Sequence, residues 1–207
     1  MKKILKLSSL VIIFMLSIIS LSFSSQTYAA DACAQYTDVA ESDWYCEKLE
    51  FLLEHGILDA RRDKFHPNTQ LNRAEALKIL YEAAGERTKS YPLRIFDIPN
   101  AWFLKYFYTA YGEKYIVPEK EKFKPAESIT KAEFLLLFMK IFEIDKGGST
   151  GCGLDVIVLN TWVKGLSLES KQYLCEAKRL NFALSFTGSF ISRADAMTVL
   201  SNALQSD

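Results

Sequence analysis

A short motif recurs three times in the chain and divides it into units of similar length. Each copy is a basic residue, an alanine and an acidic residue, and the copies are Arg73-Ala74-Glu75, Lys131-Ala132-Glu133 and Arg193-Ala194-Asp195. They stand 58 and 62 residues apart. Self-similarity at a regular spacing is typical of tandem repeats, in which neighbouring units pack together to bury a shared core. The sequence therefore predicts a repeat protein.

The similarity between the first two units extends well beyond the tripeptide. A Phe-x-Pro segment begins eight residues before the basic residue, at Phe65 in the first unit and at Phe123 in the second. Further upstream, an Asp-Val or Asp-Ile pair and a short loop lead to Trp44-Tyr45 and to Trp102-Phe103. The third unit has Leu154-Asp155-Val156 and the tripeptide but no Phe-x-Pro segment. We expect three repeats, the third degenerate, at residues 31–87, 88–146 and 147–207.

The apolar residues of each unit are spaced as in amphipathic helices. Leu49 and Leu52 lie on one face of such a helix in the first unit. Gly56 is placed to end this helix in the left-handed conformation, and Tyr115 stands at the comparable point of the second unit. The predicted fold class is all-α. The expected helices are Trp44–His55, Arg73–Ala84, Ala101–Tyr111, Ala132–Ile144, Leu168–Asn181 and Arg193–Leu204.

Each tripeptide also has the pattern of a helix start. In a capping box, the first side chain accepts a hydrogen bond from the helix start, and an acidic side chain three residues later reaches back. An acidic side chain also suits the positive end of the helix dipole. We interpret three pairs as structural caps: Asn72 with Glu75, Thr130 with Glu133, and Ser192 with Asp195.

In their order, the segments of the first unit resemble a surface-layer homology (SLH) repeat. Residues 36–84 match nearly throughout, residues 96–144 match well, and residues 154–204 match only at their two ends. The resemblance implies that three repeats form one pseudo-threefold module around a central helical bundle, with grooves between neighbouring repeats. It also implies a non-catalytic anchor that binds a secondary cell-wall polysaccharide attached to peptidoglycan.

The basic residue of each tripeptide is the main candidate for ligand binding. Arg73, Lys131 and Arg193 fall at the first helical position, where the helix dipole makes a cation mildly unfavourable. A bound anion offsets that cost, and the SLH resemblance implies an acidic group of the polymer, such as a pyruvate ketal. Arg73 is preferred, because lysine lacks the bidentate fork and the third unit lacks the Phe-x-Pro segment. The alternative is an ion pair within the chain.

Aromatic and acidic residues before the first helix of a unit are further candidates. Trp44 and Trp102 match the aromatic position of the SLH repeat and could stack on a sugar ring; the alternative is a core anchor at the helix start. Two roles suit the acidic residues Asp38, Asp97 and Asp155: they either accept hydrogen bonds from sugar hydroxyls or cap the first helix of the unit, and capping is the preferred interpretation.

The N-terminus has the features of a secretory signal. Lys2, Lys3 and Lys6 precede an uncharged apolar run, and small residues follow at Ala29 and Ala30. We expect removal of residues 1–30 rather than their retention as a membrane helix. The chain has 25 basic and 25 acidic side chains, and loss of the signal leaves a net charge of −3. This balance does not favour nucleic acid or a membrane as partner. The signal predicts export, and the SLH resemblance implies a location at the bacterial cell wall or surface.

The cysteines fit an oxidising compartment. Four cysteines permit three pairings, and the repeat pattern favours Cys33–Cys46 and Cys152–Cys175, each linking the lead segment of a repeat to its first helix. A metal site is the alternative, but the spacings are wide and unequal. We expect no metal ligands and no cofactor.

Two other function classes stand beside the anchor. A cell-wall hydrolase finds little support, because the histidines of the mature chain, His55 and His66, lie in no metal-ligand or nucleophile motif. A protein–protein adaptor of the envelope is the other alternative, since a groove that binds sugars can also bind a polypeptide.

Overall fold

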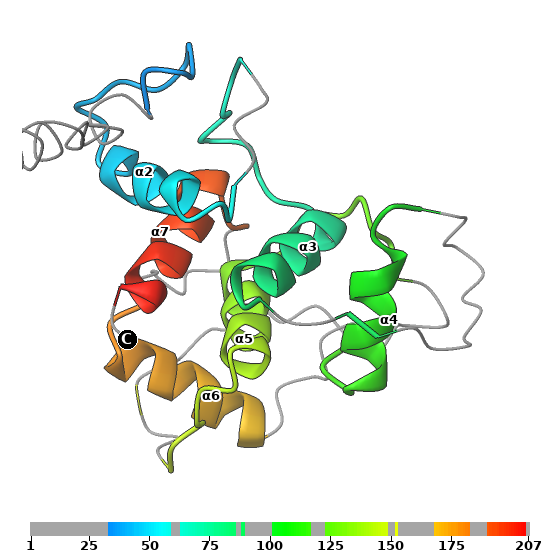
Figure 1. Ribbon diagram of the computed structural model, residues 1–207. Helices are drawn as coiled ribbons and strands as arrows, with labels where there is room; N and C mark the ends of the chain where they lie inside the picture. The colour runs from blue at the N-terminus through cyan, green and yellow to red at the C-terminus, as the bar shows by residue number, and fades with distance from the viewer. Residues whose placement is uncertain are drawn as a thin grey trace, which may run out of the picture. The chain divides into compact units, whose positions relative to one another are not determined.

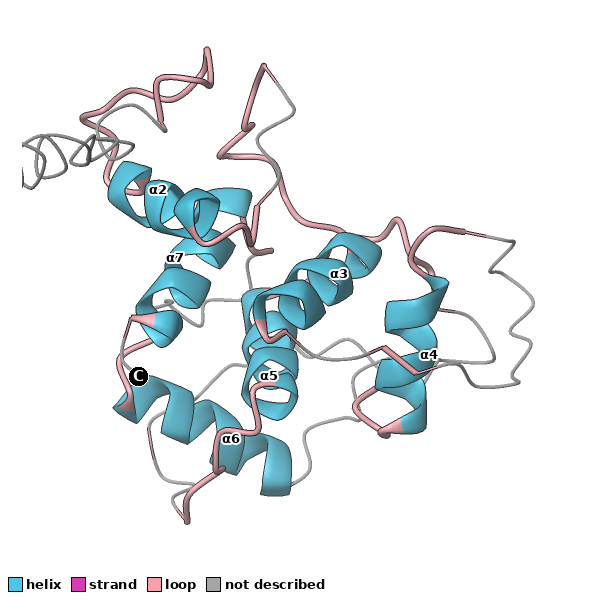
Figure 2. Cartoon of the chain, in the orientation of Figure 1, coloured by secondary structure: helices cyan, strands magenta, loops and turns pink. Residues whose placement is uncertain are grey.

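Helices form the regular secondary structure of the described residues (Figure 1, Figure 2). The computed structural model describes residues 33–58, 63–85, 88–89, 101–116, 123–148, 152, 168–182 and 190–205; the expected signal segment, residues 1–30, lies outside them. The helices are α2 (Cys46–Glu54), α3 (Arg73–Ala83), α4 (Leu104–Gly112), α5 (Lys131–Ile141), α6 (Leu168–Arg179) and α7 (Arg193–Leu204). These ranges contain isolated β-bridges but no strand, which confirms the all-α prediction. None of these helices is long and apolar enough to cross a lipid bilayer.

The predicted helices are all present, and their ends shift by three residues or fewer. The largest shift at a helix start is in α4, which begins after the Trp102-Phe103 pair rather than at Ala101. α2 begins after Trp44-Tyr45 in the same way. Neither helix start has a side-chain cap, so nothing local fixes these boundaries as the caps fix α3, α5 and α7.

The helices pack in a cyclic order. α2 packs against α7, α4 against α3, and α6 against α5 (Figure 1). The first helix of each expected repeat therefore covers the second helix of the repeat before it, and the first repeat closes on the last. α3 also packs against α5. Every residue of α5 except Lys131 is buried, so this helix lies at the centre of the core.

A ring of backbone hydrogen bonds joins the segments that lead into α3, α5 and α7. Leu71 N donates to Ile191 O, Ile191 N to Ile129 O, and Ile129 N to Leu71 O, each at 3.0 Å. All three side chains are fully buried. The ring relates the three helix starts by an approximate threefold repetition, and it sets the three basic residues at equivalent positions, each two residues after a member of the ring.

Helices α2, α4 and α6 are each followed closely by a left-handed residue. These residues are Gly56, Lys114 and Asn181, with φ of 68°, 60° and 57°. The expectation that Tyr115 stands at this point of the second unit is therefore wrong by one residue. The turn is fixed by its place after the helix, and lysine accepts the left-handed conformation there at a modest cost.

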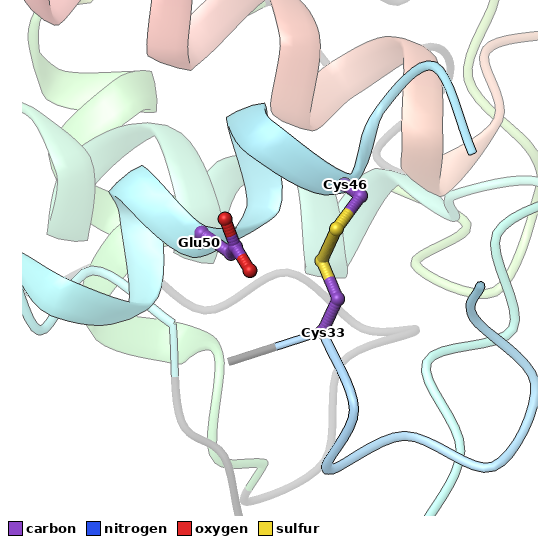
Figure 3. A group of neighbouring side chains, drawn as sticks. All are labelled: Cys33, Cys46 and Glu50. Atoms are coloured by element: carbon purple, nitrogen blue, oxygen red, sulfur yellow. A yellow bond between two sulfur atoms is a disulfide. The ribbon is translucent and has the colours of Figure 1, made fainter. Parts of the chain in front are cut away.

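Disulfides link Cys33 to Cys46 and Cys152 to Cys175. The first bridge holds the segment before α2 to the first residue of that helix (Figure 3). The second bridge reaches the later half of α6. The sequence suggested corresponding positions for the two bridges in their repeats, but the bridges lie at different positions along the two helices. They close loops of 13 and 23 residues, and a bridge of this kind stabilises a fold by roughly 2–4 kcal/mol.

Candidate ligand-binding groove

The expected caps are hydrogen-bonded at the starts of α3, α5 and α7. Asn72 Oδ1 accepts from Glu75 N at 2.8 Å, and the Glu75 carboxylate accepts from Asn72 N at 3.1 Å. Thr130 and Glu133 form the same reciprocal pair. Ser192 Oγ accepts from Asp195 N at 3.1 Å, but no reciprocal capping box forms in α7. Aspartate is one methylene shorter than glutamate, and its carboxylate instead contacts Lys131.

Arg73 is held inside the protein. Its residue is only 3% exposed. Nη1 donates to Phe123 O at 3.1 Å, and Nη2 lies 3.2 Å from Glu127 Oε2. The structure thus gives Arg73 the intramolecular acidic partner that the sequence left as an alternative.

Lys131 also has an acidic partner within the chain. Its Nζ lies 3.1 Å from Asp195 Oδ2, and both side chains are largely buried. The pair joins the start of α5 to the first turn of α7, where an acidic residue also interacts favourably with the helix dipole.

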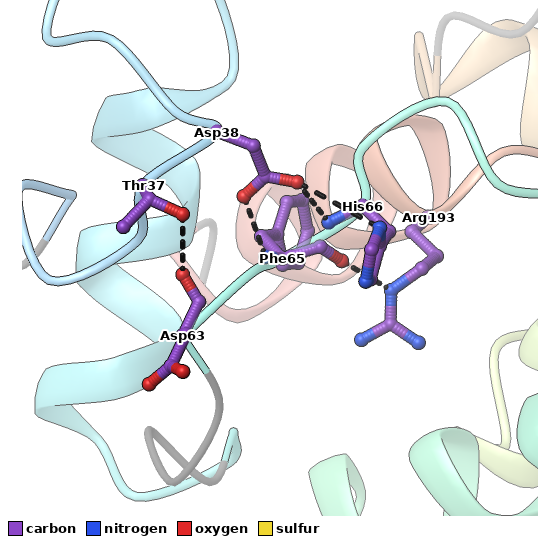
Figure 4. Close-up of polar contacts among 6 residues, drawn as sticks. All are labelled: Thr37, Asp38, Asp63, Phe65, His66 and Arg193. Carbon is purple, nitrogen blue, oxygen red and sulfur yellow. Dashed lines mark hydrogen bonds and ion pairs between the residues drawn. The ribbon is translucent and has the colours of Figure 1, made fainter.

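Arg193 differs from both, because it lies on the wall of a groove. Its Nε donates to Phe65 O at 2.8 Å, and its guanidinium carbon lies 5.3 Å from the centroid of the Phe65 ring (Figure 4). The contact is the counterpart of the contact between Arg73 and Phe123. In both cases the basic residue binds the phenylalanine carbonyl of a Phe-x-Pro segment.

Asp38 fixes the Phe-x-Pro segment of the first unit. Its two carboxylate oxygens accept from Phe65 N at 2.7 Å and from His66 N at 2.8 Å (Figure 4). Burial opposes ionisation, but the hydrogen bonds from Phe65 and His66 outweigh it and lower the pKa of Asp38. The expectation that Asp38 caps the first helix is wrong, since α2 has no side-chain cap. The other two candidates for this role, Asp97 and Asp155, lie outside the described residues.

A second contact holds the chain just before the Phe-x-Pro segment of the first unit, and the segment itself contains a residue in the left-handed conformation. Thr37 Oγ1 donates to Asp63 O at 3.1 Å (Figure 4). His66 has φ of 58°, and Lys124, its counterpart in the second unit, has φ of 53°. Non-glycine residues adopt this conformation where surrounding contacts demand it. The repeated conformation keeps the carbonyl groups of Phe65 and Phe123 directed at Arg193 and Arg73.

Both tryptophans of the expected aromatic positions are exposed. Trp44 is 63% exposed and Trp102 is 58% exposed, whereas the adjacent Tyr45 and Phe103 are buried. The interpretation of the tryptophans as core anchors is therefore wrong, and the following aromatic residue takes that place. A large exposed aromatic ring is able to stack on a ligand.

The groove that contains Arg193 has a volume of about 1250 Å³. It is lined by α3, by Trp102 and the first turn of α4, by the segment around Phe65, and by Arg193 at the start of α7. Its charged lining residues are Lys64, Lys78, Lys105, Arg193, Glu75 and Glu82. Positive side chains outnumber negative ones, so the groove favours an anionic ligand.

Polar residues on α3 and α4 connect the charges beside Trp102. Lys78 Nζ lies 3.8 Å from Glu82 Oε2 and 5.9 Å from the centroid of the Trp102 ring. Tyr106 OH donates to Glu82 Oε1 at 2.5 Å. Burial first, and then the hydrogen bond and charge of Glu82, raise the pKa of Tyr106 well above its usual range. The Tyr106 hydroxyl therefore stays protonated at neutral pH, and its hydrogen bond orients the Glu82 carboxylate in the groove.

The sequence did not single out Lys78, Glu82, Lys105 or Tyr106. Lys78 and Glu82 are four residues apart and share a helix face, which was the available signal. Lys78 and Glu82 line the same groove as Trp102 because α4 packs against α3. No local sequence pattern shows this packing.

Among the described residues, one cluster of side chains has the spacing of a metal site, although the sequence predicted no metal ligands. Cys33, Cys46 and Glu50 lie close enough to share an ion (Figure 3). Both sulfur atoms are in the disulfide, whereas metal binding requires thiolates. The cluster therefore has no cysteine ligands to offer in this state.

Two parts of the chain, residues 35–77 and 97–135, match the family model of the S-layer homology domain. Each match includes a Phe-x-Pro segment, a capping box and the start of the helix that follows. No curated protein is significantly similar to the chain in sequence. S-layer homology domains are non-catalytic anchoring modules of the cell surface that generally bind cell-wall polymers. The family match thus supports two of the three expected repeats and, with them, a role in attachment to the cell surface.

Proposed function

We propose that the protein is a cell-wall anchor that binds an acidic secondary cell-wall polysaccharide in the groove between Arg193 and Trp102. The observation that carries the proposal is the combination, in one groove, of an exposed tryptophan with four positive side chains. An acidic sugar needs both a flat apolar surface and a positive charge. The SLH similarity supplies the polymer class.

Each part of the groove suits one part of such a ligand. The ring of Trp102 offers a face for a sugar, with Lys78 beside it. Glu82, held by Tyr106, can accept hydrogen bonds from sugar hydroxyls. Arg193 and the lysines can bind a carboxylate, such as that of a pyruvate ketal, through charge-assisted hydrogen bonds.

The proposal centres on Arg193 rather than on Arg73 or Lys131. All three were candidates from the sequence, but Arg73 and Lys131 contact Glu127 and Asp195. Arg193 lies on the groove wall with Trp102. Trp44 is similarly exposed but is not one of the residues that line this groove, so it offers a matched control.

We further propose that residues 1–30 are a cleaved export signal and that the mature chain comprises three repeats. The third repeat is supported by the ring through Ile191, the cap at Ser192 and the packing of α7 against α2. These contacts make α7 the counterpart of α3 and α5.

The proposal is tested by co-sedimentation with purified bacterial wall sacculi, before and after chemical removal of the secondary polysaccharide. Binding to intact sacculi alone is the expected result. Trp102→Ala should weaken it, and Trp44→Ala should not. Equal binding to stripped sacculi would reject a polysaccharide ligand, and release of peptidoglycan fragments would instead indicate a hydrolase.

A further inference from the structure

A carboxylate lies beside the disulfide at the start of the first repeat (Figure 3). Cys33, Cys46 and Glu50 each place a ligand atom within 4.8 Å of the other two. Both cysteines are buried, and Glu50 is half-buried. Cys46 and Glu50 are four residues apart in α2, so they share one face of the helix. The cluster is thus formed by a helix face and the segment that precedes the helix.

The Glu50 side chain has no other role in the part of the chain that the structure describes. Among those residues, no hydrogen bond or ion pair engages its carboxylate. The neighbouring disulfide has neither an N–H or O–H donor nor a charge to offer it. A partly buried carboxylate loses hydration and needs a compensating contact. The oxidised cluster does not supply that contact.

The second disulfide has different surroundings. Cys175 lies in α6 as Cys46 lies in α2, but the residue four positions later is Arg179, which pairs with Glu176. Among the described residues, Cys152 and Cys175 belong to no comparable group of metal-ligand side chains. The nearby carboxylate is therefore particular to the first bridge, and the second bridge serves as an internal control.

Reduction turns the first cluster into a set of metal ligands. A dithiol reductant gives two electrons to the disulfide and leaves as its own disulfide, and each cysteine sulfur takes up one proton. A divalent ion then displaces both protons to solvent and binds the two thiolates and the carboxylate. Such ligand atoms lie roughly 3.5–4 Å apart around a tetrahedral Zn²⁺ ion. The cluster already brings its ligand atoms close to that spacing.

We propose that the reduced form of the protein binds one Zn²⁺ ion through Cys33, Cys46 and Glu50, with water as the fourth ligand. Thiolates select Zn²⁺ over Ca²⁺ and Mg²⁺, which bind through oxygen. Cysteines begin as thiols, because disulfides form in an oxidising compartment. The ion therefore links the lead segment to α2 before the disulfide does. This inference does not depend on the proposed polysaccharide.

The cluster holds a segment that forms part of the groove wall. Tyr36 N donates to Cys33 O at 3.0 Å, and the Tyr36 ring lies 5.7 Å from the ring of Phe65. Tyr36 and Phe65 both line the groove. A metal link at Cys33 would keep this wall in place in the absence of the disulfide.

The test is Zn²⁺ titration of residues 31–207, reduced with a phosphine, in competition with a chromogenic chelator. We expect one bound ion in the reduced parent and none in the oxidised parent. Glu50→Gln should weaken the affinity by at least about tenfold, the effect of losing even an outer-shell partner. Glu47→Gln is the matched control, because it removes the same charge from the exposed first turn of α2, and its affinity should equal that of the parent.

The two cysteine pairs give a second comparison. Cys152→Ser/Cys175→Ser should keep the ion, and Cys33→Ser/Cys46→Ser should lose it. With Co²⁺ in place of Zn²⁺, the thiolate charge-transfer band should follow the same pattern. A site that persists in Cys33→Ser/Cys46→Ser would overturn the assignment.

Thermal melting separates a folded site from loose thiols. Zn²⁺ should raise the melting temperature of the reduced parent, or restore cooperative melting where reduction has abolished it, because the ion binds the folded form. It should have no such effect on reduced Cys33→Ser/Cys46→Ser. No binding, equal affinity in Glu50→Gln and the parent, or binding without a gain in thermal stability would each overturn the inference. None of these results bears on wall binding by the oxidised protein.

Discussion

Arg193 donates a hydrogen bond from Nε to the carbonyl oxygen of Phe65, across 128 positions of the chain. The contact joins the last helix to the Phe-x-Pro segment of the first SLH-like repeat (Figure 4). Because both residues line the same groove, the proposed binding site exists only when the C-terminal part of the chain closes on the N-terminal part.

Removal of residues 190–207 should therefore abolish folding of the remainder. It deletes Ile191 from the hydrogen-bonded ring and takes α7 away from α2. Buried side chains such as Met197 and Leu200 stabilise a fold by roughly 1.5–3 kcal/mol each. The loss of several such side chains equals the whole free energy of unfolding of a typical domain, about 5–15 kcal/mol. Circular dichroism should show no cooperative melting. Removal of residues 206–207 alone should leave the melting unchanged; cooperative melting of the longer truncation would contradict the closed arrangement.

Asp38→Asn should lower the free energy of unfolding by roughly 1–3 kcal/mol, the cost of losing hydrogen bonds to a charged acceptor. Asparagine keeps one acceptor and turns an amide toward the second N–H of the Phe65-His66 pair. Urea denaturation measures the change. Asp63→Asn is the control, because Asp63 uses its backbone carbonyl in the contact with Thr37. Equal stability of Asp38→Asn and the parent would show that the carboxylate does not hold the segment.

The contribution of Asp38 should also depend on pH. Its pKa in the folded protein lies below the ordinary value of 3.8, so the unfolded chain takes up a proton first as the pH falls. The stabilisation is complete above about pH 5 and is lost as the pH falls through the folded pKa. Urea midpoints of the parent and Asp38→Asn should converge as the solution is acidified. A constant difference from neutral to acidic pH would be inconsistent with this ionisation.

Sequence patterns were sufficient to predict where the helices lie, but they did not predict which residues the basic residues contact. The caps at Asn72, Thr130 and Ser192 are local, and each lies immediately before a helix of the structure. The acceptor of Arg73 is Phe123, 50 positions away. No local rule places those two residues together.

The exposure of the tryptophans shows a second limit of the sequence. Trp44 and Tyr45 are adjacent and both aromatic, and only one of them can point to the core at the start of a helix. The choice depends on how α2 is rotated against α7, which is a tertiary contact. The sequence therefore identified the aromatic pair but left open which of its members packs in the core.

Lys131→Met should affect stability rather than binding. It removes the partner of a largely buried Asp195, and loss of such a pair should cost roughly 1–2 kcal/mol, between the values for exposed and fully buried pairs. Wall binding per folded molecule should be unchanged. A double-mutant cycle with Asp195→Asn measures the coupling directly. Weaker wall binding with full stability would instead make Lys131 a ligand residue.

Arg73→Ala and Arg193→Ala should separate structure from binding. Arg73→Ala leaves Phe123 O without its donor and Glu127 without one of its two cations, and we expect a loss of about 2–3 kcal/mol of stability. Its wall binding per folded molecule should match that of the parent. Arg193→Ala should weaken wall binding by about ten- to a hundredfold, the effect of losing a charge-assisted contact of roughly 1.5–3 kcal/mol.

Arg193→Lys refines the comparison between the two arginines, because it keeps the charge but not the planar fork that donates to Phe65. Its wall binding should fall between those of the parent and Arg193→Ala. Urea denaturation of each variant corrects the binding data for the folded fraction. If Arg73→Ala loses wall binding while its unfolding midpoint stays at the parental value, the binding site belongs at Arg73 and the groove at Arg193 is not the anchor. The two arginines have equivalent places in the ring of helix starts, so this pair of variants tests which surroundings make a basic residue a ligand site.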